Sequence, residues 1–421
     1  MDRVAVHGSR VGIAGGSIGG CATAIALRKA GCDVTVFERS EGLLKDRGAG
    51  IGIPVPLYAG LVADGYLTST MPACRSRQRI WIADDGRAGE GRVIWRQPSS
   101  AVLNNWAVLW RTLRAQVPDT VYREGTAVVH VDCDADGAEV TLHGGQRERF
   151  DAIVGADGYR STIRRLVTPG SKPVYARYVA WRGNLDEQHL GDQSAARALL
   201  EGAWLTICFP GGHVVLYLIP GFDQRADPGH RRLNWVVYSQ PPAATDFADA
   251  ASVPAGGVCD SHIGFLHRLV DAQLPPYWAE AVRVTTREHL SIQPIYDRAA
   301  PTYVSGRVAL IGDAATVTRP HTGSGATKAL QDALALEHAC REHSSWDDAL
   351  AAYDRERCAA GNELVELGRR LGEGQVERTP DWLAMSPADF DEWTRAMLGG
   401  HRLYHVGNVT DDADRRTVTH S

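Results

Sequence analysis

Residues 11–37 have the sequence VGIAGGSIGGCATAIALRKAGCDVTVF, which predicts a β-strand, a glycine-rich turn, a helix and a second β-strand. Residues 11–14 and 34–37 are short apolar runs of the kind that form buried strands. The Ala-rich residues 21–30 favour a helix, and Gly31 is placed to end it. This order predicts a Rossmann-like α/β domain at the start of the chain.

The turn between strand and helix carries a dinucleotide-binding pattern. Gly15, Ser17 and Gly20 have the spacing of the fingerprint, and Glu38 ends the second strand. Glycines keep side chains out of the turn, so a pyrophosphate can approach backbone N–H groups at the helix start, near Ile18. A carboxylate at Glu38 can accept hydrogen bonds from ribose hydroxyls. Ser17 replaces the usual second glycine and adds a hydroxyl that can help to bind a phosphate.

The same turn also matches a nucleophile elbow, Gly15-x-Ser17-x-Gly19, so a hydrolase is an alternative. An elbow normally lies well inside its sheet, after an oxyanion loop. Here only residues 1–10 precede the strand, and no convincing Asp…His pair follows. A nucleotide site is therefore the preferred interpretation.

Length and composition limit the remaining classes of function. The 421 residues are too many for one ordinary core, and 44% hydrophobic with 23% charged residues is typical of globular proteins. The net charge of −5 includes no Lys/Arg block, which argues against nucleic acid as a partner. The sequence shows neither a signal peptide nor an apolar run long enough to span a membrane. Eight scattered cysteines without zinc-ligand spacing predict reduced thiols, a cytoplasmic location and no metal site.

Two further motifs repeat the pattern of glycine and aspartate after an apolar strand. Asp157 lies in GADG after residues 151–154, and Asp313 lies in GDAA after residues 308–311. The third motif continues through Pro320 to a helix predicted over residues 324–342. The start of that helix can hold partial negative charge. Between the motifs, residues 173–295 are rich in aromatic residues and short alternating runs, which predicts an inserted antiparallel sheet.

The three motifs, in this order and at these separations, resemble those of FAD-dependent aromatic hydroxylases. These are the group A flavoprotein monooxygenases typified by p-hydroxybenzoate hydroxylase, and within them the 2,6-dihydroxypyridine hydroxylase subgroup is similar. The resemblance implies a discontinuous Rossmann-like FAD-binding domain with an inserted antiparallel-sheet substrate domain and C-terminal helices. The implied segments are 1–75, 99–172 and 291–360 for the FAD-binding domain, 76–98 and 173–290 for the substrate domain, and 361–421 for the C-terminal helices and tail.

The resemblance also implies a reaction. NADH or NADPH reduces bound FAD, O2 adds to give a flavin C4a-hydroperoxide, and one oxygen atom enters a hydroxylated aromatic ring such as a pyridinol or a phenol. The alternative is an FAD-binding oxidase or a non-oxygenating cyclase scaffold of the same fold. The substrate, the choice between NADH and NADPH, and the oligomeric state, with a homodimer as one option, are left open.

Carried over to this chain, the resemblance implies three groups of site residues. FAD is expected at the turn and motif residues Gly15, Ser17, Ile18, Gly20, Glu38, Arg39, Gly50, Asp157, Gly312, Asp313, Gly323, Gly325, Ala326 and Thr327. Trp106 stands where relatives carry an FAD-phosphate arginine, and Arg111, one turn further, is the candidate replacement. His321 is the candidate base beside Pro320 at the flavin. Substrate contacts are expected from Arg182, Tyr217, Trp235, Tyr238 and Gln293.

Overall fold

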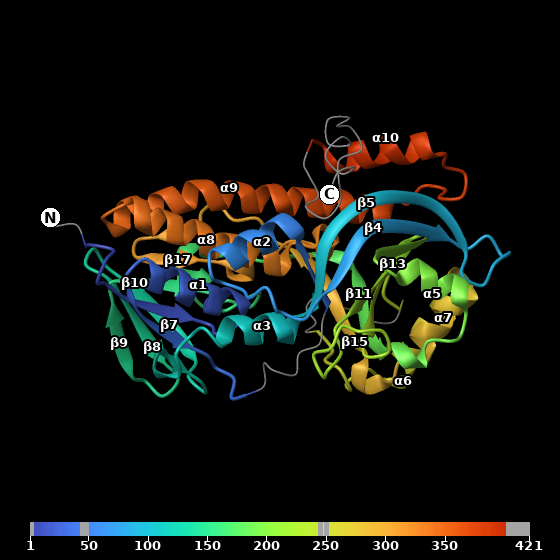
Figure 1. The fold of residues 1–421 in the computed structure, drawn as a ribbon. Helices are drawn as coiled ribbons and strands as arrows, with labels where there is room; N and C mark the ends of the chain where they lie inside the picture. Colours follow the sequence, from blue (N-terminus) through green and yellow to red (C-terminus); the bar gives the residue numbers. More distant parts are fainter. Residues whose placement is uncertain (1–3, 43–49, 243–246, 248–251, 401–421) are drawn as a thin grey trace, which may run out of the picture.

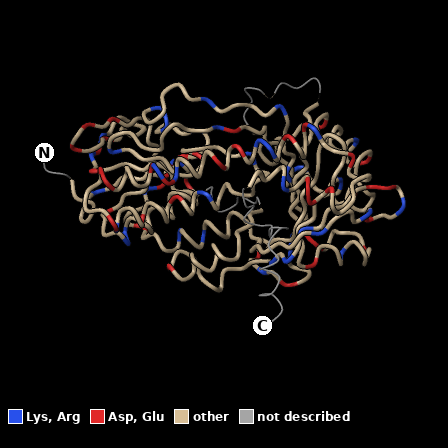
Figure 2. Tube along the Cα trace, turned by 90° about the horizontal axis from the view of Figure 1, so that it is seen from above, with Lys and Arg blue, Asp and Glu red and all other residues tan. Residues whose placement is uncertain are grey.

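Two β-sheets form the two halves of the structure, at opposite ends of the view in Figure 1. The computed structural model describes residues 4–42, 50–242, 247 and 252–400. Acidic and basic residues are interspersed along both halves of the trace in Figure 2. Within the described residues, no helix has the length and apolar character needed to cross a membrane.

The first half is a six-stranded sheet around the predicted β-α-β unit. Its order is β16 (Val304–Ser305), β17 (Val308–Leu310), β10 (Ala152–Gly155), β1 (Arg10–Ala14), β2 (Asp33–Phe37) and β6 (Tyr122–Arg123). All neighbouring pairs are parallel except β16 with β17. The predicted Rossmann-like α/β fold is confirmed. Helix α1 (Ile18–Lys29) begins before the predicted residue 21, because Gly19 and Gly20 are part of the helix.

Helices cover this sheet, and some of them reach toward the second half. Helix α1 packs against α8 (Gly325–Glu342) and α3 (Trp106–Arg114), and α8 packs against the long helix α9 (Trp346–Gly372). The smaller elements nearby are α2 (Val55–Ala63), α4 (Arg164–Val167) and a three-stranded sheet of β7 (Val128–Cys133), β8 (Ala138–Leu142) and β9 (Arg147–Phe150). The hairpin predicted over residues 126–142 is confirmed as β7 and β8, and β9 adds a third strand.

The second half is an eight-stranded sheet. Its order is β15 (Ser291–Asp297), β11 (Val174–Asp186), β14 (Arg232–Ser239), β13 (Gly212–Ile219), β12 (Ala203–Phe209), β4 (Cys74–Ala83), β5 (Arg92–Asn105) and β3 (Gly50–Pro54). The predicted antiparallel arrangement holds for every neighbouring pair but one, since β12 and β4 run parallel. This pair joins strands from distant parts of the chain, for which local sequence carries no signal. The boundaries of the domain segments remain a prediction.

The two faces of the eight-stranded sheet differ in chemistry. Alternate residues point to opposite faces of a strand. One face carries Trp181, Leu205, Leu216 and Trp235, which are buried against helices α5 (Ser194–Leu200), α6 (Asp260–Gln273) and α7 (Pro276–Arg283). The other face carries the polar and aromatic residues Arg79, Arg182, His213, Tyr217, Tyr238 and Gln293, which line a cavity.

The C-terminal segment packs beside this second face. Helix α9 continues into a π-helical turn (Glu373–Glu377), and α10 (Pro387–Leu398) lies next to β4 and β5 in Figure 1. An aromatic cluster of Trp81, Trp95, Trp382 and Phe390 fills this contact. The tail predicted over residues 411–421 lies outside the described residues.

Candidate functional site

Two adjoining cavities lie between the two halves. The first, called here the dinucleotide cavity, has a volume of about 710 Å³ and is bordered by the turn after β1. The second, called the inner cavity, has a volume of about 320 Å³ and is bordered by the polar face of the eight-stranded sheet. The residues that line both are Ile51, Tyr159, Ser252, Asp313, Gly325 and Ala326. The two cavities therefore meet at the start of α8.

The turn after β1 can exist only with glycine at key positions. Gly15 has a φ of +105°, and a Cβ there would overlap the carbonyl oxygen of Ala156. A Cβ on Gly20 would overlap the carbonyl oxygen of Gly15. Ser17 lies at the N-cap of α1 without capping it, and both Ser17 and Ile18 line the dinucleotide cavity. The turn thus opens toward a ligand at the positive end of α1.

Glu38 bonds to the backbone of the turn and also lines the dinucleotide cavity. Its carboxylate accepts hydrogen bonds from the backbone N–H of Gly16 at 2.7 Å and of Ser40 at 2.9 Å. Trp110 of α3 donates its indole N–H to the Gly16 carbonyl at 2.9 Å. The turn is therefore held from two sides. A ribose contact of Glu38, which lines the dinucleotide cavity, stays a prediction.

A buried ion-pair network holds the third motif. Lys328 donates to the Gly312 carbonyl at 2.8 Å and to Asp332 at 3.0 Å, while the Gly312 N–H donates to Asp332 at 2.9 Å. Arg357 donates to the second oxygen of Asp332 at 2.7 Å. This network fixes the backbone next to Asp313, a residue that lines both cavities. Desolvation raises the pKa of Asp313 above its usual value.

The remaining predicted FAD residues divide between the two cavities. Arg39, Asp157, Gly312, Gly325 and Ala326 line the dinucleotide cavity. Asp157 also accepts the backbone N–H of Thr162 at 2.6 Å, so it shapes its own loop. Thr327 is buried at the start of α8, where its hydroxyl donates to the Ser324 carbonyl at 3.2 Å, and it lines neither cavity.

Gly50 and Gly323 line the inner cavity, which adjoins the dinucleotide cavity at Asp313, Gly325 and Ala326, so their contact with FAD stays a prediction. Trp106 lines the dinucleotide cavity, whereas Arg111 does not. Arg111 follows Trp106 by five residues, about 1.4 helical turns, which puts it on a different side of α3. The geometry therefore does not support it as a replacement for the phosphate arginine.

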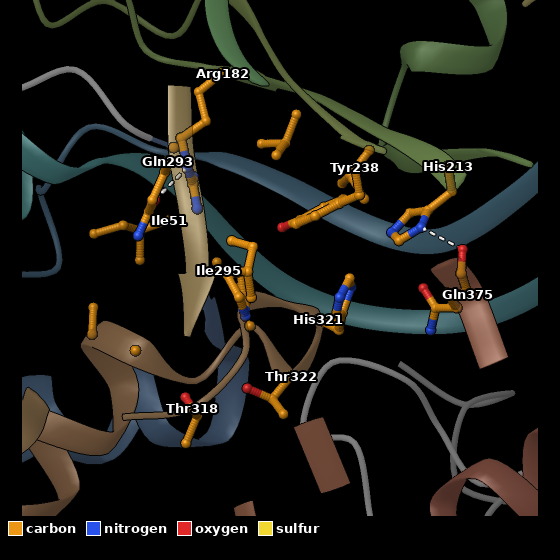
Figure 3. Close-up of a pocket in the computed structure, with 18 of the residues that line it drawn as sticks. Ile51, Arg182, His213, Tyr238, Gln293, Ile295, Thr318, His321, Thr322 and Gln375 are labelled. Atoms are coloured by element: carbon orange, nitrogen blue, oxygen red, sulfur yellow. Dashed lines mark hydrogen bonds between the residues drawn. The ribbon is translucent and has the colours of Figure 1, made fainter. Parts of the chain in front are cut away.

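Four of the predicted substrate residues line the inner cavity. Arg182 donates to the side-chain carbonyl of Gln293 at 2.9 Å, and both lie at one side of the cavity in Figure 3. Tyr217 and Tyr238 form its aromatic wall. The prediction for Trp235 is wrong. Trp235 lies on the opposite face of β14, fully buried, where its indole N–H donates to Thr285 at 2.9 Å.

His321 lies at the other side of the inner cavity, next to Pro320. Its Nε2 is 2.7 Å from the Tyr178 hydroxyl, and its Nδ1 has no hydrogen-bond partner among the described residues. Its ring centroid is 4.5 Å from that of Tyr238. Desolvation, and then the nearby His213, lower the pKa of His321 well below its usual value. The imidazole is therefore neutral at physiological pH and is a weaker base than the near-neutral group expected from the sequence.

The residues of the inner cavity that lie outside the predicted site set include three polar side chains. His213 and Arg79 project from β13 and β4, and Gln375 comes from the π-helical turn. The backbone carbonyl of Gln375 accepts a hydrogen bond from His213 Nδ1 at 3.2 Å (Figure 3). The alternation of β13 places His213 on the same face as Tyr217, and this signal could have found it. Gln375 and Arg79 have no such local signal.

The sequence matches three family models. They are a Rossmann-like NAD(P)-binding domain over residues 13–43, an FAD-binding-domain-like family over 175–291 and an FAD-binding domain over 265–367. Among curated relatives, 2,6-dihydroxypyridine 3-monooxygenase of Paenarthrobacter nicotinovorans is 26% identical, over 87% of this chain and 92% of that protein. The 3-amino-4-hydroxybenzoate 2-monooxygenase of Streptomyces cremeus is 28% identical, over 86% of this chain and 87% of that protein.

Solved structures share the fold. 2,6-Dihydroxypyridine-3-hydroxylase from Arthrobacter nicotinovorans has a TM-score of 0.79 at 22% identity, over 96% of this chain and 98% of that one. HpxO of Klebsiella pneumoniae, solved with FAD and uric acid, has a TM-score of 0.75 at 22% identity, over 93% of this chain and 95% of that one. The family matches indicate a dinucleotide cofactor, FAD, for the dinucleotide cavity, whose turn keeps side chains out.

Proposed function

We propose that the chain is an FAD-dependent monooxygenase of the aromatic-hydroxylase type whose inner cavity binds a hydroxylated aromatic ring, a pyridinol or a phenol, for oxygen insertion. The observation that carries this proposal is the junction of the two cavities at Asp313, Gly325 and Ala326. A cofactor in one cavity and a ring in the other would meet there.

FAD would be held by Gly15, Ser17, Asp157 and Asp313, with its reactive ring at the junction. When bound and reduced by NAD(P)H, FAD would activate O2, which supplies the oxygen atom that enters the ring. The first turn of α8 borders this junction, and its positive end favours negative charge on a neighbouring group. The protein residues supply position and exclude water from the reaction.

His321 would position the ring hydroxyl of the substrate. Its Nδ1 is a buried polar atom without a partner among the described residues, and such atoms are costly to leave unsatisfied. The Tyr178 hydroxyl can donate a hydrogen bond to Nε2 or accept one from it, so both neutral tautomers of His321 are possible. In one tautomer Nδ1 accepts a hydrogen bond from a ring hydroxyl, and in the other it donates one to a ring oxyanion. Tyr217 and Tyr238 would stack on or flank the ring.

A visible spectrum followed by an assay of NAD(P)H oxidation tests the function. Flavin absorption bands together with NAD(P)H consumption that hydroxypyridines or phenols stimulate, and a hydroxylated product, are the expected results. A protein with bound flavin that makes no hydroxylated product from any ring would favour the oxidase or cyclase alternative. A colourless protein that cannot be reconstituted with FAD would contradict the assignment itself.

The cysteines support the proposal of a reducing, cytoplasmic compartment. All eight are free thiols, and Cys21, Cys32, Cys208 and Cys340 are buried. Proteins in oxidising compartments commonly use paired cysteines as disulfides. Mass analysis of the protein from cells, with and without reductant, would show whether the thiols stay free.

A further inference from the structure

Lys328 is a buried cation that lines neither cavity and to which the proposed function assigns no role. It lies in the first turn of α8, is 1% exposed, and its ammonium lies 5.4 Å from the ring centroid of Tyr303. Desolvation acts to lower the pKa of Lys328, but the charge of Asp332 outweighs it and raises this pKa above its usual value. The side chain is therefore charged inside the protein.

Lys328 and Asp332 hold Gly312 at both of its backbone groups. The Gly312 carbonyl accepts from Lys328, and the Gly312 N–H donates to the same carboxylate oxygen of Asp332 that accepts from Lys328. Gly312 has a φ of +59°, in the left-handed region that favours glycine, and an added Cβ would lie 3.1 Å from the Cβ of Ala329. The ion pair thus fixes a sharp turn after β17, residues 312–315, called here the third-motif turn.

Two buried arginines hold the rest of the third-motif turn. Arg164 donates to the Asp313 carbonyl at 3.1 Å and to the Ala314 carbonyl at 3.2 Å. Arg298 donates to the Ala314 carbonyl at 3.4 Å and also to the Ala315 carbonyl. These arginines bond backbone carbonyls as the ammonium does, so a cationic donor reaches every carbonyl of the turn. The first peptide unit of the turn receives its cationic donor from α8.

This first peptide unit borders the dinucleotide cavity. The Gly312 carbonyl and the Asp313 N–H belong to one planar trans peptide, so they point in opposite directions. The carbonyl points at Lys328, which lines neither cavity, whereas Gly312 and Asp313 both line the dinucleotide cavity. The Asp313 N–H therefore points away from the ammonium, toward the side that borders the cavity. A charged donor on the carbonyl polarises the peptide and strengthens its N–H as a donor.

We infer that Lys328 is a positioning residue for the cofactor, which holds and polarises the Gly312–Asp313 peptide so that the Asp313 N–H donates to an oxygen of FAD. The inference rests on the FAD part of the proposed function and is independent of which ring is hydroxylated. FAD offers phosphate and carbonyl oxygens that can accept such a bond, and a bond to a charged phosphate oxygen is a strong one.

The rate of FAD release from the holoenzyme tests this role without turnover. Lys328→Met removes the ammonium and keeps most of the side-chain volume. The rise in flavin fluorescence after dilution measures the release. The variant is expected to release FAD roughly 10- to 100-fold faster than the wild type, the range of one hydrogen bond to a charged group.

Arg357→Met is the matched control. It removes the other cation that bonds Asp332, through a carboxylate oxygen that Gly312 does not share. Each variant breaks a buried ion pair, so urea unfolding of the two apoproteins should show a lower midpoint for both. A purely structural role of Lys328 would speed FAD release in both variants in step with this loss. The positioning role predicts wild-type release for Arg357→Met and faster release for Lys328→Met.

Lys328→Gln keeps a hydrogen-bond donor and loses the charge, so its rate of FAD release should lie between those of the wild type and Lys328→Met. If Lys328→Met does not fold, the glutamine variant is compared with Arg357→Met in its place. The inference is overturned if either lysine variant releases FAD no faster than Arg357→Met. Failure of the proposed reaction has a different readout, because a wild type that binds FAD but hydroxylates no ring would still show the difference between the variants.

Discussion

The dinucleotide cavity and the inner cavity meet at the same helix start, yet they are built in opposite ways. Backbone turns shape the first, where Gly15 and Gly20 exclude side chains and Glu38 is bound to backbone N–H groups. Side chains from separate strands shape the second, where Arg182 and His213 project from an alternating sheet. A backbone-built site depends on a short stretch of sequence, whereas a site built of side chains depends on how distant strands align.

The largest effect is expected from a substitution that disrupts the turn of the dinucleotide cavity. Gly20→Ala would place a Cβ against the Gly15 carbonyl, so the turn must shift and FAD should be lost together with activity. The ratio of flavin to protein absorbance after gel filtration measures this loss. Gly60→Ala in α2 is the control, since nothing lies within 4 Å of its added Cβ and it lines neither cavity, and it should retain FAD. Equal retention of FAD by both variants would contradict the role of the turn.

The second largest effect is expected from a substitution in the buried face of the eight-stranded sheet, behind the inner cavity. Trp235→Ala removes a fully buried side chain from the helix-covered face and should lower the free energy of unfolding by roughly 3–5 kcal/mol. Urea unfolding followed by circular dichroism measures the loss. Trp235→Phe should cost less, because most of the apolar volume remains. A variant as stable as the wild type would place Trp235 outside the core and reopen its role in the cavity.

The buried histidines make stability depend on pH. The pKa of His213 is lowered to about 3 in the folded protein from an ordinary 6.5, so the unfolded chain binds more protons between these values. The stability is complete above pH 6.5 and is lost as the pH falls toward the folded value. From pH 6.5 to 5 the loss from His213 is about 2 kcal/mol, at ~1.4 kcal/mol per unit. His321 acts in the same direction.

Unfolding titrations at pH 7 and pH 5 test this dependence. His213→Asn removes the titrating group and should flatten the difference in unfolding free energy between the two pH values. His338→Asn, at an exposed position of α8, is the control and should leave the difference as it is in the wild type. If His213→Asn retained the full difference, another group would be the cause.

The smallest expected effect concerns one hydroxyl of the inner cavity. Tyr238→Phe keeps the ring on the cavity-facing side of β14 and removes one hydrogen-bonding group, which is worth about 0.5–1.5 kcal/mol. The variant should raise KM for the ring substrate about 2- to 12-fold and change the free energy of unfolding by less than about 1 kcal/mol. A large loss of stability with an unchanged KM would show that Tyr238 packs like Trp235.

The sequence by itself determined the β-α-β unit, the fingerprint turn and the motifs at Asp157 and Asp313. Each of these depends on residues close together in the chain, because a turn that requires glycine and a helix start are local properties. The position of Arg111 was less readable from the sequence. It was proposed as a replacement for a missing arginine at Trp106, and among the two only Trp106 lines the dinucleotide cavity.

Only the tertiary structure decided which residues share the inner cavity. Arg79, His213, Gln293 and Gln375 come from four distant segments, and the pairing of β4 with β12 is what sets Arg79 into the same wall as the others. Strand register also placed Tyr238 in the cavity and Trp235 in the core, since neighbouring residues of a strand face opposite sides. Register is set by the packing of the whole sheet, and no short stretch of sequence contains it.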